Sequence, residues 1–330
     1  MTTRMMLLMS ALAVPAFAQE ERLDVYVYDG FTADWGPGPL IEEAFEAECG
    51  CDLQFHPSGD GAAMLSRLQL EGDQAAADVV MGLDINQLEQ ARKTGLFAAP
   101  ETEATPELLP VEWTDEMFIP FDWSYLAFIY DSTKIAAPPK SFEEMIAMDE
   151  DIKFVMQDPR SSVTGLGAMM WVKAAYGDDS ARIWEGLAPH ILTVTKGWTE
   201  AYGMFTDGEA DMVLSYSTSP AYHIIADEDD TKKAAEFEEG HYLNIEVAAK
   251  TAAADAPDLA EDFLAFIQGP EVQAILPTGN WSYPVVMPED GLPEAFETLI
   301  EPEKAFLLPP EEADALREEA IAEWRDILAR

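Results

Sequence analysis

Residues 118–130 read FIPFDWSYLAFIY, an extended and strongly aromatic stretch near the middle of the chain. Before it, short apolar runs alternate with segments of helical periodicity, and after it a second such alternation follows. Strands that alternate with helices imply a parallel sheet with right-handed crossovers. The stretch therefore separates two α/β units, and we expect it to carry the chain from one lobe to the other.

Each unit has its own predicted elements. The first contains strands at 23–28, 51–56 and 78–82, and helices at 39–48, 62–70 and 86–94. The second contains strands at 153–157, 191–195, 211–216 and 241–248, and helices at 168–176 and 199–206, with further helices at 259–267 and 311–328. We expect an α/β fold with one lobe of 19–120 plus 247–285 and a second lobe of 121–246 plus 286–330. Ligands in such folds bind beyond the carboxyl ends of the strands, so the cleft between the lobes is the expected site.

The N-terminus reads MTTRMMLLMSALAVPAFA. Arg4 precedes the short apolar run 5–14, and Ala16-Phe17-Ala18 fits a small-x-small cleavage site. Residues 1–18 are therefore predicted to be a signal peptide, the alternative being a buried N-terminal helix. No cysteine stands at the cleavage point and no later apolar run reaches the roughly 18–20 residues that span a bilayer. We expect a soluble protein exported to the periplasm.

The charge is strongly negative, with 63 acidic and 19 basic residues and a net charge of −44. This balance disfavours nucleic acid as a partner, because a phosphate backbone requires neutralisation by Lys and Arg. It is compatible with a cationic ligand. The alternative interpretation is solubility at high salt, to which most of the charge is assigned.

Metal-binding signals are weak. Cys49 and Cys51 form a single C-x-C pair, which an exported chain could oxidise into a very tight loop, and their redox state is left open. The four histidines lack the spacing of a metal motif. We expect neither a metal site nor a cofactor.

Aromatic, hydroxyl and acidic residues follow several predicted strands. Tryptophan and tyrosine faces attract desolvated cations and stack on flat rings. A serine before a helix caps it, and free N–H groups at the same place can receive a phosphate. Taken singly, these residues are explained by turns, caps or packing. Together they predict a binder of a small, flat, partly cationic solute; the candidates are Tyr28, Trp35, Asp60, Ser162, Trp198, Tyr216, Ser217, Thr218, Ser219, Tyr222 and Trp281.

Long motifs extend this interpretation. YVYDGFTADWGPGP, ADVVMGLD, QDPRSSVTGLG, TVTKGWTEAYGMF, GEADMVLSYSTSPAYH and PTGNWSYPV resemble segments of the periplasmic thiamine-binding proteins of bacterial thiamine ABC importers, and the resemblance covers essentially the whole chain. It implies the two-lobed type II periplasmic binding protein fold. It also implies a monomeric, non-enzymatic binding component that captures thiamine, thiamine monophosphate or thiamine diphosphate by lobe closure and delivers it to a membrane permease.

The resemblance also implies roles for individual residues. Asp60 and Gly61 match a contact to the aminopyrimidine, Ser162 and Val163 match the loop at the phosphate end, and Trp198 matches a stacking residue. The strand-end contacts are Tyr216, Ser217, Thr218 and Ser219, and the aromatics lining the cleft are Tyr28, Trp35, Tyr222 and Trp281. The chain departs from the family within QDPRSSVTGLG, and its low Lys and Arg content weakens the expected preference for phosphate.

Three alternatives compete with this function. A thiamine-cleaving enzyme of the same fold would need a cysteine nucleophile, but Cys49 and Cys51 begin a strand whose other end faces the cleft, roughly 20 Å away. A ferric-iron binder would use paired tyrosines, here Tyr216 and Tyr222. A polyamine binder would need several carboxylates at the cleft, where the sequence indicates only Asp60 together with Asp29 or Asp84.

Overall fold

The computed structural model describes residues 21–328, so the predicted signal peptide lies outside the described residues. One mixed sheet runs through this part of the chain. Its order is β2 (Asp52–Pro57), β1 (Arg22–Val27), β3 (Val79–Asp84), β9 (His241–Lys250), β4 (Ile119–Asp131), β7 (Met212–Tyr216), β5 (Phe154–Gln157) and β6 (Ile191–Thr195). The short strands β8 (Lys232–Ala234), β10 (Tyr283–Pro284) and β11 (Ala305–Phe306) pair at its margins.

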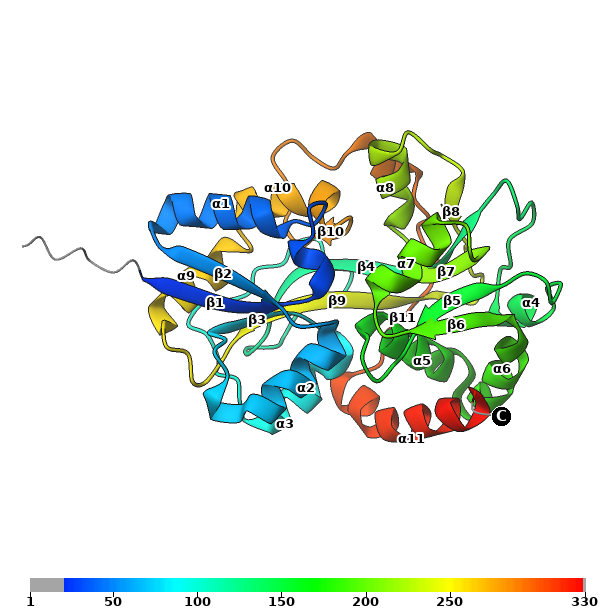
Figure 1. Ribbon diagram of the computed structural model, residues 1–330, viewed down its shortest axis with the longest axis horizontal. Coiled ribbons are helices and arrows are strands. Elements are labelled where there is room, and N and C mark those ends of the chain that lie inside the picture. Colours follow the sequence, from blue (N-terminus) through cyan, green and yellow to red (C-terminus); the bar gives the residue numbers. More distant parts are fainter. Residues whose placement is uncertain (1–20, 329–330) are drawn as a thin grey trace, which may run out of the picture.

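Two long antiparallel strands, β4 and β9, connect the two halves of the molecule (Figure 1). The first part of β4 pairs with β9, and from Leu126 onward β4 pairs with β7. The far end of β9, from Glu246 to Lys250, pairs with β3. The expectation that the 118–130 stretch carries the chain between two α/β units is therefore confirmed, while the exact lobe boundaries stay a prediction.

Helices cover both faces of each half. In the first half, α1 (Gly38–Cys49), α9 (Pro257–Phe266) and α10 (Pro270–Gly279) enclose one hydrophobic core, and α2 (Gly61–Glu71) and α3 (Leu88–Thr94) enclose another. In the second half, α4 (Phe142–Ile146), α5 (Val163–Tyr176), α6 (Ser180–Leu187) and α11 (Pro310–Leu328) pack on one face. The other face is covered by α7 (Trp198–Thr206), and α8 (Ser219–Ala226) packs beside it.

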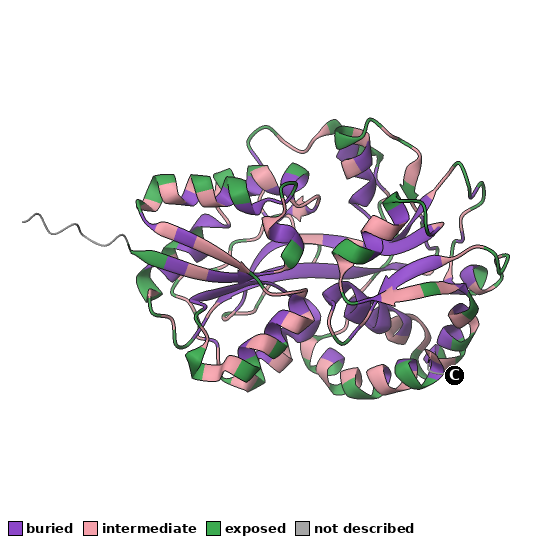
Figure 2. Cartoon of the chain, viewed as in Figure 1, coloured by how far each residue is buried: buried purple, intermediate pink, exposed green. Residues whose placement is uncertain are grey.

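The central strands are the most deeply buried part of the sheet (Figure 2). The predicted elements agree with the observed ones to within a few residues, with two exceptions. Helix α5 begins at Val163 rather than Ala168, because Gly165 allows the helix to pack against β5: a Cβ at that position would lie 2.4 Å from the Gln157 carbonyl oxygen. The helix expected at 86–94 is divided into a 3₁₀ turn, Ile85–Gln87, followed by α3.

Two further features bear on earlier expectations. Cys49 and Cys51 form a disulfide between the end of α1 and the start of β2, which settles the redox state left open by the sequence. Among residues 21–328, no helix is both long and apolar enough to cross a membrane.

The core of the second half depends on Phe128 of β4, whose ring packs against Phe142, Phe154, Trp171 and Phe237. Phe128→Ala should lower the free energy of unfolding by about 3–5 kcal/mol, because it leaves a cavity among rings that cannot collapse into it. Urea unfolding followed by circular dichroism measures this loss. Leu70→Ala is the control, since that side chain is 90% exposed, and equal midpoints for the two variants would contradict the packing role.

Candidate functional site

A carboxylate joins three helices where the two halves meet. Asp60 is the N-cap of α2, and its Oδ1 accepts hydrogen bonds from the N–H groups of Gly61 at 2.7 Å and Val163 at 3.2 Å. Its Oδ2 accepts from the N–H of Trp198 at 3.2 Å. Val163 and Trp198 are the first residues of α5 and α7, so the carboxylate lies at three helix N-termini, where free N–H groups and the helix dipoles favour an anion. Burial raises the pKa of Asp60, and the Ser162 hydroxyl together with these three N–H groups opposes that rise.

The same junction holds two more predicted residues. A Cβ on Gly61 would lie 2.5 Å from both the Gly82 carbonyl oxygen and Val163 Cγ1, so only glycine permits this approach. Ser162 is fully buried. Its Oγ makes no hydrogen bond of ordinary geometry to a described residue, but its hydroxyl lies close enough to the Asp60 carboxylate to stabilise the ionised form. Asp60, Gly61, Ser162, Val163 and Trp198 therefore form one cluster, although the resemblance assigns them to different ends of a ligand.

Four of the predicted aromatic residues, Trp35, Trp198, Tyr222 and Trp281, belong to one row of rings, which Tyr202 and His223 complete. Its successive ring pairs are Trp35–Trp198 at 6.1 Å, Trp198–Tyr202 at 4.6 Å, Tyr202–His223 at 5.9 Å, His223–Tyr222 at 4.9 Å and Tyr222–Trp281 at 5.2 Å. The two ends of the row differ from ordinary packing. Trp35 is 45% exposed, whereas Trp281 has a buried indole N–H without a partner and a left-handed φ of 56°, which is rare for a bulky residue.

The other predicted residues divide into two groups. Ser219 has a local role, because its hydroxyl bonds to that of Ser215, which accepts the indole N–H of Trp198 at 2.8 Å. Ser217 is buried and bonds through its N–H to the carbonyl of Tyr125. Thr218, in contrast, is fully buried with an unpartnered Oγ1.

Two tyrosines complete the site. The Tyr28 hydroxyl donates to Asn280 Oδ1 at 2.6 Å, and the Asn280 side-chain N–H donates to Asp122. The Tyr216 hydroxyl bonds to Thr164 Oγ1 at 2.9 Å. Burial and neighbouring carboxylates raise the pKa values of both tyrosines, so both phenols stay protonated at neutral pH.

Two of the three carboxylates at the centre of the sheet, Asp122 and Glu246, were not identified from the sequence, whereas Asp84 was named as a candidate cleft acid. Glu246 of β9 pairs in register with Asp122 of β4 and Asp84 of β3. All three are buried, and burial raises the pKa of Asp84 to about 7 and those of Asp122 and Glu246 above their usual range. The available signal was a single acid inside each of two apolar strands, FIPFDWSYL and HYLNIEVAA.

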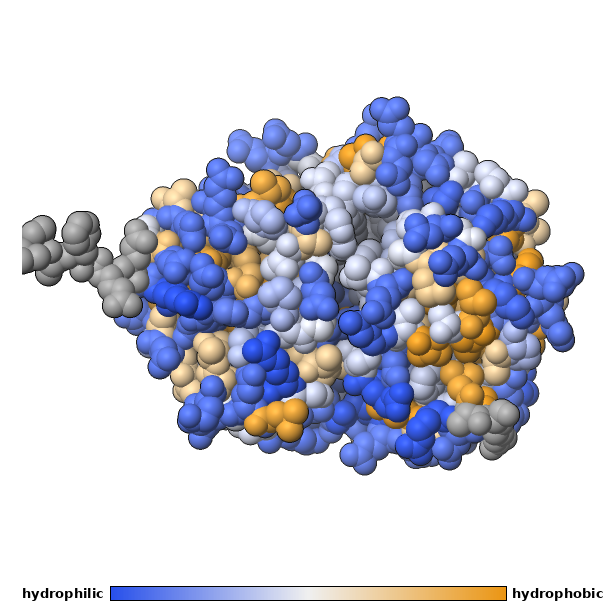
Figure 3. Space-filling model, viewed as in Figure 1, coloured by the Kyte–Doolittle hydropathy of each residue, from blue (hydrophilic) through white to orange (hydrophobic). Residues whose placement is uncertain are grey.

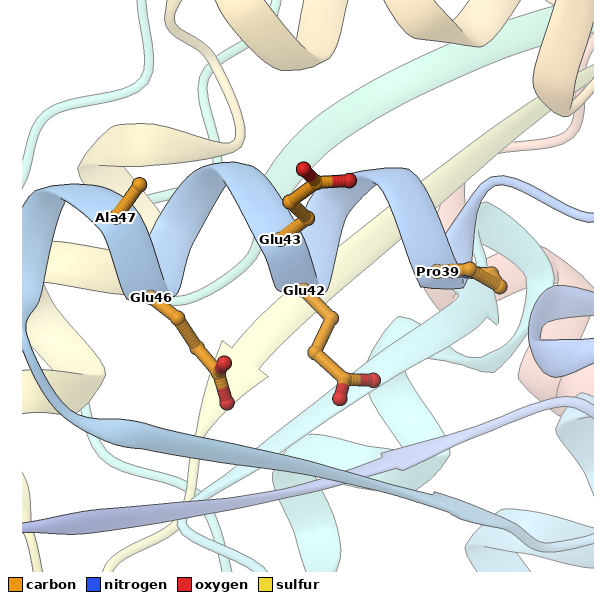
Figure 4. Close-up of a pocket in the computed structure, with 5 residues that line it drawn as sticks. All are labelled: Pro39, Glu42, Glu43, Glu46 and Ala47. Carbon is orange, nitrogen blue, oxygen red and sulfur yellow. The ribbon is translucent and has the colours of Figure 1, made fainter.

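The face shown in Figure 3 is hollowed between the two halves. A more open hollow of about 480 Å³ lies on α1, lined by Pro39, Glu42, Glu43, Glu46 and Ala47 (Figure 4), and another of about 530 Å³ lies beside α10. Neither contains a predicted site residue. Within the described part of the chain, no group of His, Cys, Asp or Glu side chains is placed to hold a metal ion.

A family model described as "Bacterial extracellular solute-binding protein" matches residues 37–274. The chain belongs to this family of bacterial extracellular solute-binding proteins. The thiamine-binding periplasmic protein of Escherichia coli (strain K12) is 48% identical over 316 residues, which cover 96% of each chain. That of Brucella abortus biovar 1 is 46% identical over 310 residues, which cover 94% of this chain and 93% of the relative.

Solved structures confirm the expected type II periplasmic binding protein fold. A "Periplasmic thiamin binding protein" matches this solute-binding protein with a TM-score of 0.91 and 48% identity, over 94% of this chain and 97% of that one. Iron-bound HitA from Pseudomonas aeruginosa matches with a TM-score of 0.73 and 22% identity, over 93% of this chain and 99% of that one, which shows a shared fold alone.

The junction at Asp60 gives a stability prediction. Asp60→Ala should lower the free energy of unfolding by about 1–2 kcal/mol, because three N–H groups lose their acceptor. Ser141→Ala is the matched control, since Ser141 caps only its own helix α4, through a hydrogen bond from Glu144 N–H. Thermal unfolding at pH 7 measures both. A smaller loss for Asp60→Ala than for Ser141→Ala would show that the contacts to α5 and α7 add nothing.

Proposed function

We propose that this solute-binding protein binds thiamine in the periplasm and delivers it to the membrane permease of an ABC importer, without catalysing a reaction on it. The observation that carries the proposal is the row of aromatic rings ending at Trp35 and Trp281. This row meets buried carboxylates at two points: the Trp198 N–H donates to Asp60, and Asn280, next to Trp281, donates to Asp122. The near-full-length similarity to thiamine-binding periplasmic proteins supports it.

Thiamine fits this chemistry. Its thiazolium ring is a permanent cation and its aminopyrimidine is flat and carries N–H donors. A desolvated cation over a tryptophan or tyrosine face gains about 0.5–2 kcal/mol per contact. Two ends of the proposed site thus recognise different properties: the rings recognise shape and positive charge, and the carboxylates recognise charge and donors.

Thiamine monophosphate and diphosphate belong to the proposal as further ligands. Ser162 Oγ is buried at the start of α5, and the first N–H groups of α5 and α7 donate to Asp60, on which the Ser162 hydroxyl also acts. A phosphate placed there would receive hydrogen bonds from a hydroxyl and from helix N-termini. The Asp60 carboxylate accepts from these N–H groups, so a phosphate has to compete with it.

The thiaminase alternative loses its nucleophile in this structure. The only two cysteines of the sequence form a disulfide with each other, so neither supplies a free thiolate. The iron alternative is also disfavoured, because the Tyr216 hydroxyl bonds to Thr164 and the Tyr222 ring packs edge-on against Trp281.

The polyamine alternative gains one argument. Asp122 and Glu246 add buried carboxylates to Asp60 and Asp84, so the cleft has more acids than the sequence indicated. A flexible polyamine, however, offers no flat ring on which the aromatic row could stack.

Ligand binding tests the function directly. Mature protein, unfolded and refolded to remove carried-over ligand, should show saturable quenching of tryptophan fluorescence by thiamine at micromolar concentration or below, and no response to spermidine. Unchanged tryptophan fluorescence on addition of thiamine to the folded protein would refute the proposal. A response to spermidine alone would establish the polyamine alternative instead.

Trp35→Ala serves as the matched variant for this titration. Its side chain is exposed, so the fold should survive, while thiamine binding should weaken by about 1–2 kcal/mol through loss of a ring beside Trp198. Trp113→Phe is the control, because Trp113 lies outside the row and donates its indole N–H to the Phe118 carbonyl. Equal affinities for the two variants would remove Trp35 from the site.

Ser162→Ala separates the phosphorylated ligands from thiamine. Binding of thiamine monophosphate should weaken by about 1.5–3 kcal/mol, because a hydrogen bond to a charged group is lost. Thiamine affinity should fall less, since thiamine carries an uncharged hydroxyl at the position where its phosphate esters carry the anion. Calorimetric titration with both ligands measures the difference, and an equal loss for both would contradict a phosphate role for Ser162.

A further inference from the structure

A strip of polar side chains crosses the sheet where β4 and β9 pass between the two halves. On β9, Leu243, Ile245 and Val247 contribute to the core formed with α2 and α3. The alternate residues Asn244 and Glu246 therefore point to the opposite face, where Ala248 belongs to the core beneath α1, α9 and α10. Burying a pair of polar residues in the middle of a strand destabilises the folded state unless they have hydrogen-bond partners.

The neighbouring strands extend the strip. Asn244 lies opposite Ser124, and Glu246 lies opposite Asp122 on β4 and Asp84 on β3. Residues in register point to the same face, so these carboxylates stand side by side across three strands. No salt bridge reaches Asp84, Asp122 or Glu246 from any described residue. Their partners are all neutral: the side chain and N–H of Asn86 and the N–H of Gln87 for Asp84, Asn280 and Ser282 for Asp122, and the Tyr28 hydroxyl for Glu246.

The unsatisfied atoms of the strip are all acceptors. Glu246 Oε2, Asp84 Oδ1 and Asn244 Oδ1 are buried without a hydrogen-bond partner among the described residues. Asn244 is 2% exposed and carries no charge, so its orphaned oxygen is an observation independent of the acids. A ligand that brings donors and positive charge would satisfy these acceptors.

The strip lies within the proposed site. The charge of Glu246 acts on both Tyr28 and Tyr216, which the sequence assigned to ligand binding. The titratable groups that face Glu246 are Asp122 from β4, Asp84 from β3, Asp60 from the start of α2, and these two tyrosines. None of these groups is a cation.

We propose that Glu246, supported by Asp122, is the counter-ion of the ligand's cationic ring, and that binding of the ligand releases a proton from this pair to the solvent. The inference rests on the proposed function and specifies its charge recognition. In the free protein the buried pair holds a proton, because two adjacent carboxylates out of water do not both ionise. A cation beside them favours the ionised form: one O–H bond breaks, the electron pair stays on the carboxylate, and the proton leaves with no other reactant.

The coupling between proton release and ligand binding determines how the thiamine affinity depends on pH. Because the pKa of the pair is raised in the free protein and lowered in the complex, thiamine affinity should rise with pH until the free pair is ionised and then level off. Isothermal titration calorimetry at pH 7 in PIPES and in Tris, which differ in ionisation heat, gives the number of protons released. We expect a net release with the wild type.

Glu246→Gln keeps the shape and removes the charge. It should weaken thiamine binding about thirtyfold or more and reduce the proton release. Glu271→Gln is the matched control, since it makes the same change on an exposed position of α10 and should leave both quantities at the wild-type value. If Glu246→Gln has a lower melting temperature than the wild type, Asp122→Asn gives a second test, with a smaller expected loss of thiamine affinity.

The outcomes separate this inference from the proposed function. Wild-type protein that binds thiamine without releasing protons, or Glu246→Gln and Asp122→Asn variants that bind like the wild type, would overturn the counter-ion role while the function stands. Folded wild-type protein that does not bind thiamine would overturn the function itself.

Discussion

The antiparallel pairing of β4 with β9 is the constraint on which the rest of the structure depends. These two strands connect the halves, and every helix that contributes to the candidate site is positioned by one half or the other. Because both strands are buried along most of their length, their side chains are apolar wherever they lie inside a core. Polar side chains occur where the strands pass from one core to the other, and that crossing is also the floor of the proposed cleft.

The carboxylates at this crossing lower the stability of the free protein and favour binding of a cationic ligand. A carboxylate buried without a cation destabilises the folded state at neutral pH, and raising its pKa only moderates the cost. The sheet carries three such groups side by side, at Asp84, Asp122 and Glu246. Apolar residues would satisfy the fold better at these positions. The acids are therefore best explained by a ligand that supplies the missing positive charge, and closure around it strengthens the interaction by excluding water.

Much of the fold could be predicted from the sequence because its elements are locally encoded. The alternation of strands and helices, the crossing stretch at 118–130 and the aromatic residues after the strands are all visible as short patterns. Glu246 and Asp122 could not be found in this way, since they are more than 120 residues apart in sequence and meet only through strand register. The same limit applies to the contact between the Ser219 and Ser215 hydroxyls, through which Ser219 supports the indole N–H of Trp198.

The Asp60 junction shows how such tertiary contacts change the meaning of a motif. In the sequence, Asp60 is an acid in a Gly-Asp-Gly turn. The loop before α5 is a separate motif that predicts a contact to a phosphate. In the structure the Asp60 carboxylate accepts from the N–H groups of Val163 and Trp198, which are the donors that a phosphate would need. The free protein thus satisfies its own anion site with an internal carboxylate. A phosphorylated ligand has to displace that carboxylate or approach it as a like charge, whereas thiamine does neither, so the contribution of a phosphate to affinity depends on how readily Asp60 leaves the helix N-termini.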